Sequence, residues 1–216
     1  MEDLKKTEIS FRNVTYRDIK KIVDIKKKYN FLKFDKWFSY VYEINKEEEL
    51  LMLNLIKNNR LYLQSFNEEQ LKASFIIPIL FRVNFIFDGI RDWYEYSIST
   101  KINGVLLKGK PDFMIAKGDF FPEKPYFFIQ EFKRSNTNSD PEIQLIAEML
   151  VAMKINNKKK LHACYILGRN WFFVILEKLK SESYEYFVSE SFDCLKIKEL
   201  KQIYINLQAV KALFCN

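Results

Sequence analysis

Residues 103–134 read NGVLLKGKPDFMIAKGDFFPEKPYFFIQEFKR, and this stretch decides the predicted fold. Asn103-Gly104 is a strong signal for a tight turn between two β-strands. The alternation of residue types around it predicts strands over about 92–102 and 105–117, and a third strand follows over 126–134. Three consecutive strands therefore form the centre of the predicted fold.

Helices are predicted on both sides of these strands. Asn67 can cap a helix over about 67–82, which Pro78 should bend or divide. Asp140 followed by Pro141 combines a capping residue with a proline at the first helical position, so a helix should follow the third strand. The other predicted elements are helices over 16–30, 46–58 and 197–213, and strands near 161–167, 171–178 and 183–189.

This order of elements predicts a single α/β domain over residues 1–216, with a central mixed β-sheet flanked by helices. Hydrophobic residues make up 48% of the chain, which is typical of a globular protein rather than a disordered one.

The charge balance favours an anionic partner. The formal net charge is +7, and nucleic acid is the commonest partner of a basic protein. A lysine-rich surface that only aids solubility would explain the same charge.

Cysteine and histidine usage excludes some classes of site and favours a compartment. The chain has three cysteines outside any C-x-x-C motif and one histidine, His162, so a Cys/His zinc site is not expected. The odd cysteine count and the lack of a secretory leader predict a cytoplasmic location. No run of 18 apolar residues occurs, so no membrane span is expected.

Two acids and a lysine interrupt strands that are otherwise apolar. Glu131 and Lys133 are two residues apart and should share one face of the third strand, while Phe132 points the other way. If the second and third strands pair, Asp112 reaches the same place. Burying these charges is costly unless they are paired or bind a metal ion. A structural Glu–Lys pair at the rim of a sheet is the alternative.

The same residue types suit a divalent metal centre. Mg²⁺ and Mn²⁺ prefer carboxylate oxygens, which Asp112 and Glu131 would supply, together with the backbone carbonyl of Phe132. Such a metal polarises a phosphate and lowers the pKa of a bound water. Lys133 would position or deprotonate that water and offset the charge of the transition state.

Pro111-Asp112, followed by Glu131-x-Lys133 19 residues after the aspartate, resembles the signature of the PD-(D/E)xK phosphodiesterase superfamily. The motif is short, but it falls on consecutive predicted strands and is followed by Gln144, early in the next helix. Many members carry a glutamine near the metal site at that point. The resemblance implies that Gln144 orients the site.

A second similarity covers residues 68–80, which resemble the first core helix of restriction-related members. There a helix glutamate completes the acidic cluster, and the match assigns this role to Glu68, with Glu69 in reserve. The alternative is that both are first-turn acids that interact with the helix dipole.

The resemblance implies a restriction-endonuclease-like core in αβββαβ order over about 68–178, with 1–66 and 179–216 as helical elaborations. It implies a metal-dependent nuclease that uses Mg²⁺ or Mn²⁺ and acts on nucleic acid, DNA ahead of RNA, and it leaves a homodimer open. Two alternatives remain. One is a non-catalytic nucleic-acid-binding module on the same fold, and the other is an unrelated α/β protein-interaction subunit in which the motif is a coincidence.

Further residues are lesser candidates. Glu95 could join the metal cluster, and Glu148 lies one turn beyond Gln144 and could flank the site. The basic residues that could hold a phosphate backbone are Lys108, Lys110, Arg134 and Lys158–Lys160.

Overall fold

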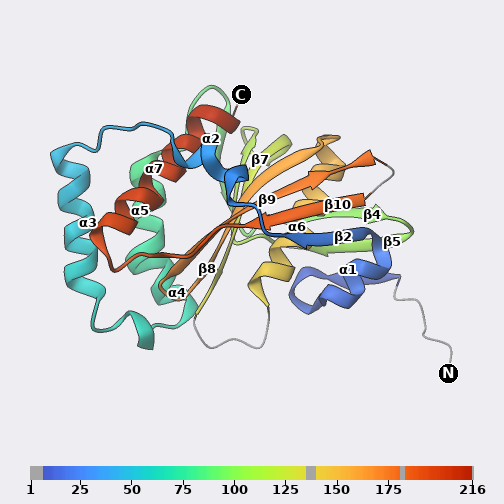
Figure 1. Ribbon diagram of the computed structural model, residues 1–216, viewed down its shortest axis with the longest axis horizontal. Coiled ribbons are helices and arrows are strands. Elements are labelled where there is room, and N and C mark those ends of the chain that lie inside the picture. Colours follow the sequence, from blue (N-terminus) through green and yellow to red (C-terminus); the bar gives the residue numbers. More distant parts are fainter. Residues whose placement is uncertain (1–6, 135–139, 181–182, 216) are drawn as a thin grey trace.

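The structure is a computed structural model that describes residues 7–134, 140–180 and 183–215. A large mixed β-sheet lies between helices, and a smaller sheet lies beside it (Figure 1). The predicted α/β class with a central mixed sheet is therefore confirmed.

Eight strands form the large sheet. In order across the sheet they are β2 (Asp24–Lys28), β10 (Ser183–Val188), β9 (Asn170–Lys178), β8 (Lys160–Leu167), β7 (Glu123–Lys133), β6 (Phe113–Lys117) and β3 (Ile90–Tyr94), with β11 (Phe192–Asp193) paired to β9. Strands β3, β6 and β7 are antiparallel neighbours, whereas β8 runs parallel to β7. The small sheet has the order β1 (Glu8–Ser10), β5 (Val105–Gly109), β4 (Ile98–Ile102).

Helices cover both faces of the large sheet (Figure 1). The α-helices are α1 (Tyr16–Ile22), α2 (Asp35–Phe38), α3 (Lys46–Asn59), α4 (Glu68–Leu71), α5 (Ile77–Val83), α6 (Pro141–Asn156) and α7 (Ile197–Phe214). Short 3-10 turns are η1 (Phe11–Asn13), η2 (Phe31–Phe34) and η3 (Leu63–Ser65), and a π-helical segment, η4 (Lys72–Ile76), joins α4 to α5.

The large sheet separates two hydrophobic cores, as the alternation along its strands requires. Phe113 and Phe128 pack with the helices α2, α3, α5 and α7 on one face. Met114 and Ile129 pack on the other face against α1, α6 and the small sheet. Phe113 and Met114 on β6, and Phe128 and Ile129 on β7, thus belong to different cores.

The predicted hairpin turn is confirmed, but the strands around it were predicted wrongly. Asn103 and Gly104 both have positive φ, as a tight hairpin turn needs, and they join β4 to β5. The strand predicted over 92–102 is β3 and β4, which are separated by Glu95 in the left-handed region. The strand predicted over 105–117 is β5 and β6, which are separated at Pro111, a residue without an N–H for a ladder. The hairpin belongs to the small sheet, and β3 and β6 belong to the large one.

The prediction of one helix over 16–30 was also wrong. Helix α1 ends at Ile22, and β2 follows and pairs in parallel with β10. Val23 and Ile25 are both buried, and this spacing of two suits a strand. The N-terminal region therefore contributes strands as well as helices, contrary to the expectation of a helical elaboration, whereas β10 in the C-terminal region matches the strand predicted near 183–189.

Capping residues fix the helices that carry the site. Asn67 forms a capping box with Gln70 at the start of α4, and Asp140 accepts hydrogen bonds from the first turn of α6. Pro78 divides the helix predicted over 67–82, since α5 starts at Ile77 after the π-helical segment. The carbonyl of Ser74, which Pro78 cannot bond, accepts a hydrogen bond from Asn59 instead.

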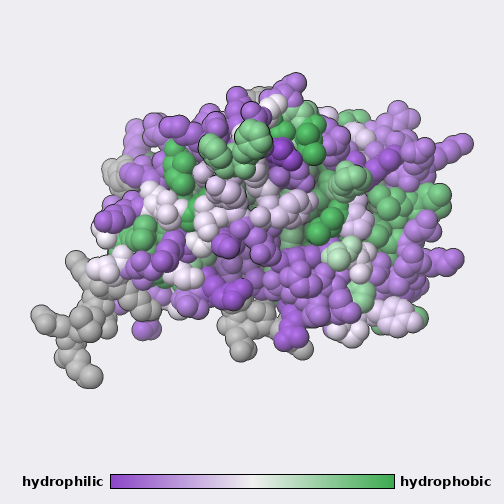
Figure 2. Space-filling model, turned by 180° about the vertical axis from the view of Figure 1, so that it is seen from behind, coloured by the Kyte–Doolittle hydropathy of each residue, from purple (hydrophilic) through white to green (hydrophobic). Residues whose placement is uncertain are grey.

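Figure 2 shows one face of the molecule, on which hydrophobic residues lie between hydrophilic ones. In the part of the chain that the structure describes, no helix combines the length and the apolarity needed to cross a membrane.

Candidate active site

The pairing of β6 with β7 brings the two halves of the motif together. Phe113 pairs with Gln130, so Asp112 lies opposite Glu131. Asp112 itself precedes β6 in a bend and is not a strand residue, contrary to the prediction. Its Oδ2 accepts a hydrogen bond of 2.7 Å from the backbone N–H of Phe132. This bond fixes the Asp112 carboxylate beside β7, and it is the amide of Phe132 that makes the contact. Metal binding by the Phe132 carbonyl stays a prediction.

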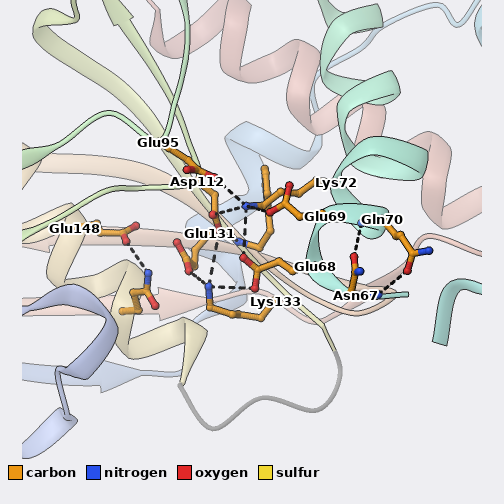
Figure 3. Close-up of polar contacts among 12 residues, drawn as sticks. Asn67, Glu68, Glu69, Gln70, Lys72, Glu95, Asp112, Glu131, Lys133 and Glu148 are labelled. Atoms are coloured by element: carbon orange, nitrogen blue, oxygen red, sulfur yellow. Dashed lines mark hydrogen bonds and ion pairs between the residues drawn. The ribbon is translucent and has the colours of Figure 1, made fainter. Parts of the chain in front are cut away.

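Lys133 lies among three carboxylates (Figure 3). Its Nζ forms an ion pair with Oε1 of Glu131, lies 3.7 Å from Oε2 of Glu68 and lies 4.0 Å from Oδ2 of Asp112. The alternation of β7 places Glu131 and Lys133 on one face, as expected, with Phe132 in the opposite core. The structure thus brings together four of the predicted site residues: Asp112, Glu131, Lys133 and Glu68.

Burial makes this cluster electrostatically unusual. Glu131 has no exposed surface, and burial together with the charge of Asp112 raises the pKa of Glu131 to about 8. Burial opposes the charged form of Lys133, but Glu131 and Asp112 outweigh it and raise the pKa of Lys133. Lys133 is therefore an ammonium donor at neutral pH in this arrangement.

Lys72 is part of the site, although no role was predicted for it from the sequence. It is 7% exposed, and its Nζ lies 2.9 Å from Oδ1 of Asp112 and 3.4 Å from Oε1 of Glu68. These carboxylates outweigh burial and raise the pKa of Lys72. The spacing of four between Glu68 and Lys72 was the available signal, because such residues share a helix face.

The two candidate helix acids differ in their contacts. Glu68 contacts both lysines of the cluster, with Oε1 near Lys72 and Oε2 near Lys133. Glu69 contacts Lys72 at 3.6 Å and has a side chain that is 79% exposed. Glu95, from the segment between β3 and β4, also contacts Lys72, at 3.4 Å. The geometry favours Glu68 as the acid closest to the motif residues.

Gln144 is placed behind the cluster. Its side-chain amide donates to Oε1 of Glu148 at 3.2 Å. Glu148 is completely buried, and burial together with the nearby charge of Glu131 raises the pKa of Glu148 strongly. Gln144 thus bonds to Glu148, whose carboxyl is close enough to Glu131 for the two to affect each other electrostatically, on the face of the sheet that α6 covers.

The donor chemistry of the cluster fits a divalent cation. Apart from the ion pair with Lys133, the two oxygens of Glu131 have no hydrogen-bond donor among the described residues. An unpaired buried carboxylate is costly, and a hard cation would satisfy it. Within those same residues, no three Asp, Glu, His or Cys side chains already surround a common metal position. The lysines Lys72 and Lys133 now contact the carboxylates that would bind the ion.

The basic residues predicted to hold phosphates fall into two groups. Lys108 and Lys160 form ion pairs with Glu8 and Glu177. Lys110 and Lys158 are exposed, and Lys159 is exposed beside Lys158. Phosphate binding by any of them stays a prediction.

His162 lies away from this cluster and packs as a structural residue. Its ring stacks on Phe214 with centroids 3.6 Å apart and meets the edge of Trp37. Burial lowers the pKa of His162 to about 3. His162 is therefore protonated below about pH 6.5 in the unfolded chain, but only below about pH 3 in the folded protein.

This difference predicts a pH-dependent loss of stability. As the pH falls from 6.5 towards 3, the free energy of unfolding should fall because of His162, by roughly 1.4 kcal/mol per pH unit. Urea unfolding of the wild type and His162→Leu at pH 7.5, 6 and 5 measures it. The variant should lose less stability on acidification. If the free energy of unfolding falls with pH at the same slope in both proteins, His162 does not cause the loss of stability.

Comparison of the sequence with protein-family models and with curated proteins found no match.

Proposed function

We propose that the protein is a metal-dependent nuclease of the PD-(D/E)xK type that hydrolyses phosphodiester bonds, with DNA as the first substrate to test. The observation that carries the proposal is the convergence of Asp112, Glu131, Lys133 and Glu68 at one end of β6 and β7. A purely structural Glu–Lys pair would not need Asp112 and Glu68 in the same contact network.

The order of the elements also supports the proposal. Helices α4 and α5 precede the antiparallel strands β3, β6 and β7, and α6 then leads to β8, which is parallel to β7. This order is similar to the αβββαβ order of a restriction-endonuclease-like core, with the β4–β5 hairpin as an insertion. The buried Oε2 of Glu131, which has no hydrogen-bond partner among the described residues, is a second support, because a cation would satisfy it.

In the proposed reaction, Asp112, Glu131 and Glu68 would hold a Mg²⁺ or Mn²⁺ ion. The bound ion would polarise the scissile phosphate and lower the pKa of an attacking water. The Lys133 ammonium orients that water and offsets negative charge on the phosphate in the transition state. The Phe132 N–H keeps Asp112 in place, and Gln144 donates a hydrogen bond to Glu148 on α6.

The test is cleavage of supercoiled plasmid, circular single-stranded DNA and an RNA oligonucleotide, with Mn²⁺ or Mg²⁺ and with EDTA. We expect cleavage that requires the metal ion, and closed circular substrates separate endonuclease from exonuclease activity. Binding of these nucleic acids without cleavage would favour a non-catalytic module. Neither binding nor cleavage would favour the protein-interaction subunit.

A further inference from the structure

Lys72 occupies an unusual place in the chain. It is the first residue of the π-helical segment that follows α4, and such segments are rare and frequently found at functional sites. Its side chain is 9% exposed. A buried ammonium is unfavourable unless nearby carboxylates offset its charge.

Four carboxylates surround the Lys72 ammonium (Figure 3). The Nζ–oxygen distances are 2.9 Å to Asp112, 3.4 Å to Glu68 and to Glu95, and 3.6 Å to Glu69. A lysine ammonium is a compact charge with three hydrogen-bond donors, so it can be shared among several carboxylates as a metal ion is.

Asp112 faces two cation positions with its two oxygens. Oδ1 contacts Lys72, whereas Oδ2 faces the Phe132 N–H and the side on which Glu131 and Lys133 lie. In two-metal nuclease centres, two ions about 3.5–4 Å apart act on the attacking and leaving oxygens of the same phosphate. Here the ammonium of Lys72, which is part of the protein itself, fills one of the two positions beside Asp112.

A cavity gives the substrate access to this ammonium. It has a volume of about 380 Å³ and is lined by Lys72, Asp112, Tyr94 and Phe132, among others. Glu69 and Glu95 also line the cavity, so a phosphate oxygen that entered from this side would reach the Lys72 ammonium past their carboxylates, while the other oxygen of Asp112 faces Glu131.

We propose that Lys72 is a second catalytic cation that contacts the scissile phosphate in place of a second metal ion, so that the centre takes one divalent ion per chain. The inference rests on the proposed nuclease function. Lys72 would be the cation on the Oδ1 side of Asp112, and a single metal ion bound with Glu131 would be the other cation.

The test counts bound ions and measures cleavage in the full chain. Electron paramagnetic resonance measures free Mn²⁺, and subtraction from the total gives the bound ions per chain. We expect one bound ion in the wild type and two in Lys72→Met. At the Mn²⁺ concentration that saturates the wild type, Lys72→Met should cleave roughly 10- to 100-fold more slowly, and recover in part as Mn²⁺ is raised. Lys72→Arg keeps the charge and should still bind one ion.

Controls keep these outcomes interpretable. Lys57→Met removes an exposed lysine from α3 and should match the wild type in both measurements. Thermal melting in EDTA shows whether each variant folds. If Lys72→Met does not fold, Lys72→Gln, which keeps a hydrogen-bond donor, is titrated instead.

Two results overturn the inference alone: two Mn²⁺ ions in a wild type that cleaves, or a folded Lys72→Met or Lys72→Gln protein that binds one ion and cleaves at the wild-type rate. A wild type that neither binds Mn²⁺ nor cleaves would overturn the proposed nuclease function and this inference together.

Discussion

Asp112→Asn is expected to abolish Mn²⁺ binding and to lower metal-dependent cleavage at least about 10³-fold. Asp112 contacts both lysines of the site and is fixed by the Phe132 N–H. Loss of a metal ligand removes several kcal/mol of transition-state stabilisation, and each 1.4 kcal/mol corresponds to about tenfold in rate. The measurements are Mn²⁺ titration and plasmid cleavage.

The choice of asparagine separates metal binding from folding. Its amide oxygen can still accept the hydrogen bond from Phe132, whereas its charge is lost. Asp119→Asn is the matched control, because Asp119 is exposed and lies just beyond the opposite end of β6. An Asp112→Asn protein that keeps the wild-type melting temperature in EDTA, Mn²⁺ affinity and cleavage rate would exclude Asp112 from the metal centre.

The meeting of Asp112 with Glu131 and Lys133 could be predicted because it depends on local rules. Side chains two apart on a strand share a face, and two strands close in sequence pair readily. Glu68 followed from the resemblance of its helix, and the capping box of Asn67 fixes the residue at which that helix begins. The pairing of Asp112 with the Glu131–Lys133 segment needed no knowledge of distant packing, whereas the contact of Glu68 with Lys133 was implied by the resemblance alone.

Lys72 and the small sheet could not be predicted in the same way. The contacts of Lys72 with Asp112 and Glu95 join segments that are far apart in the sequence. The strand predicted over 105–117 is regular in composition, yet its first half pairs in one sheet and its second half in the other. Periodicity identifies which face of a strand is apolar, but it does not identify the sheet to which the strand belongs.

Residues 16–30 show the same limit for a helix. Lysines interleaved with isoleucines suit an amphipathic helix up to Ile22, and the same residue types then continue as β2. Pairing with β10 decides the conformation, and Lys27 bonds to Glu142 at the start of α6. Tertiary pairing overrides the local helical preference here.

Lys133→Met is expected to lower cleavage by roughly 10²- to 10³-fold while Mn²⁺ still binds. Lys133 is a donor to the reacting groups rather than a metal ligand. Its loss should therefore lower the cleavage rate without changing the number of bound metal ions. Removing the ammonium also removes competition for Glu131 and Glu68. Mn²⁺ affinity should therefore stay the same or rise, in contrast to Asp112→Asn.

The matched control is Lys117→Met, since Lys117 is an exposed lysine at the far end of the neighbouring strand β6. It should cleave and bind Mn²⁺ as the wild type does. Single-turnover cleavage on saturating DNA, with Mn²⁺ binding measured on the same preparations, distinguishes a slower chemical step from weaker metal binding. A Lys133→Met protein that cleaves at the wild-type rate would remove Lys133 from the mechanism. One that loses Mn²⁺ instead would make Lys133 a residue that positions Glu131, because the ion pair would then be what keeps the carboxylate in place.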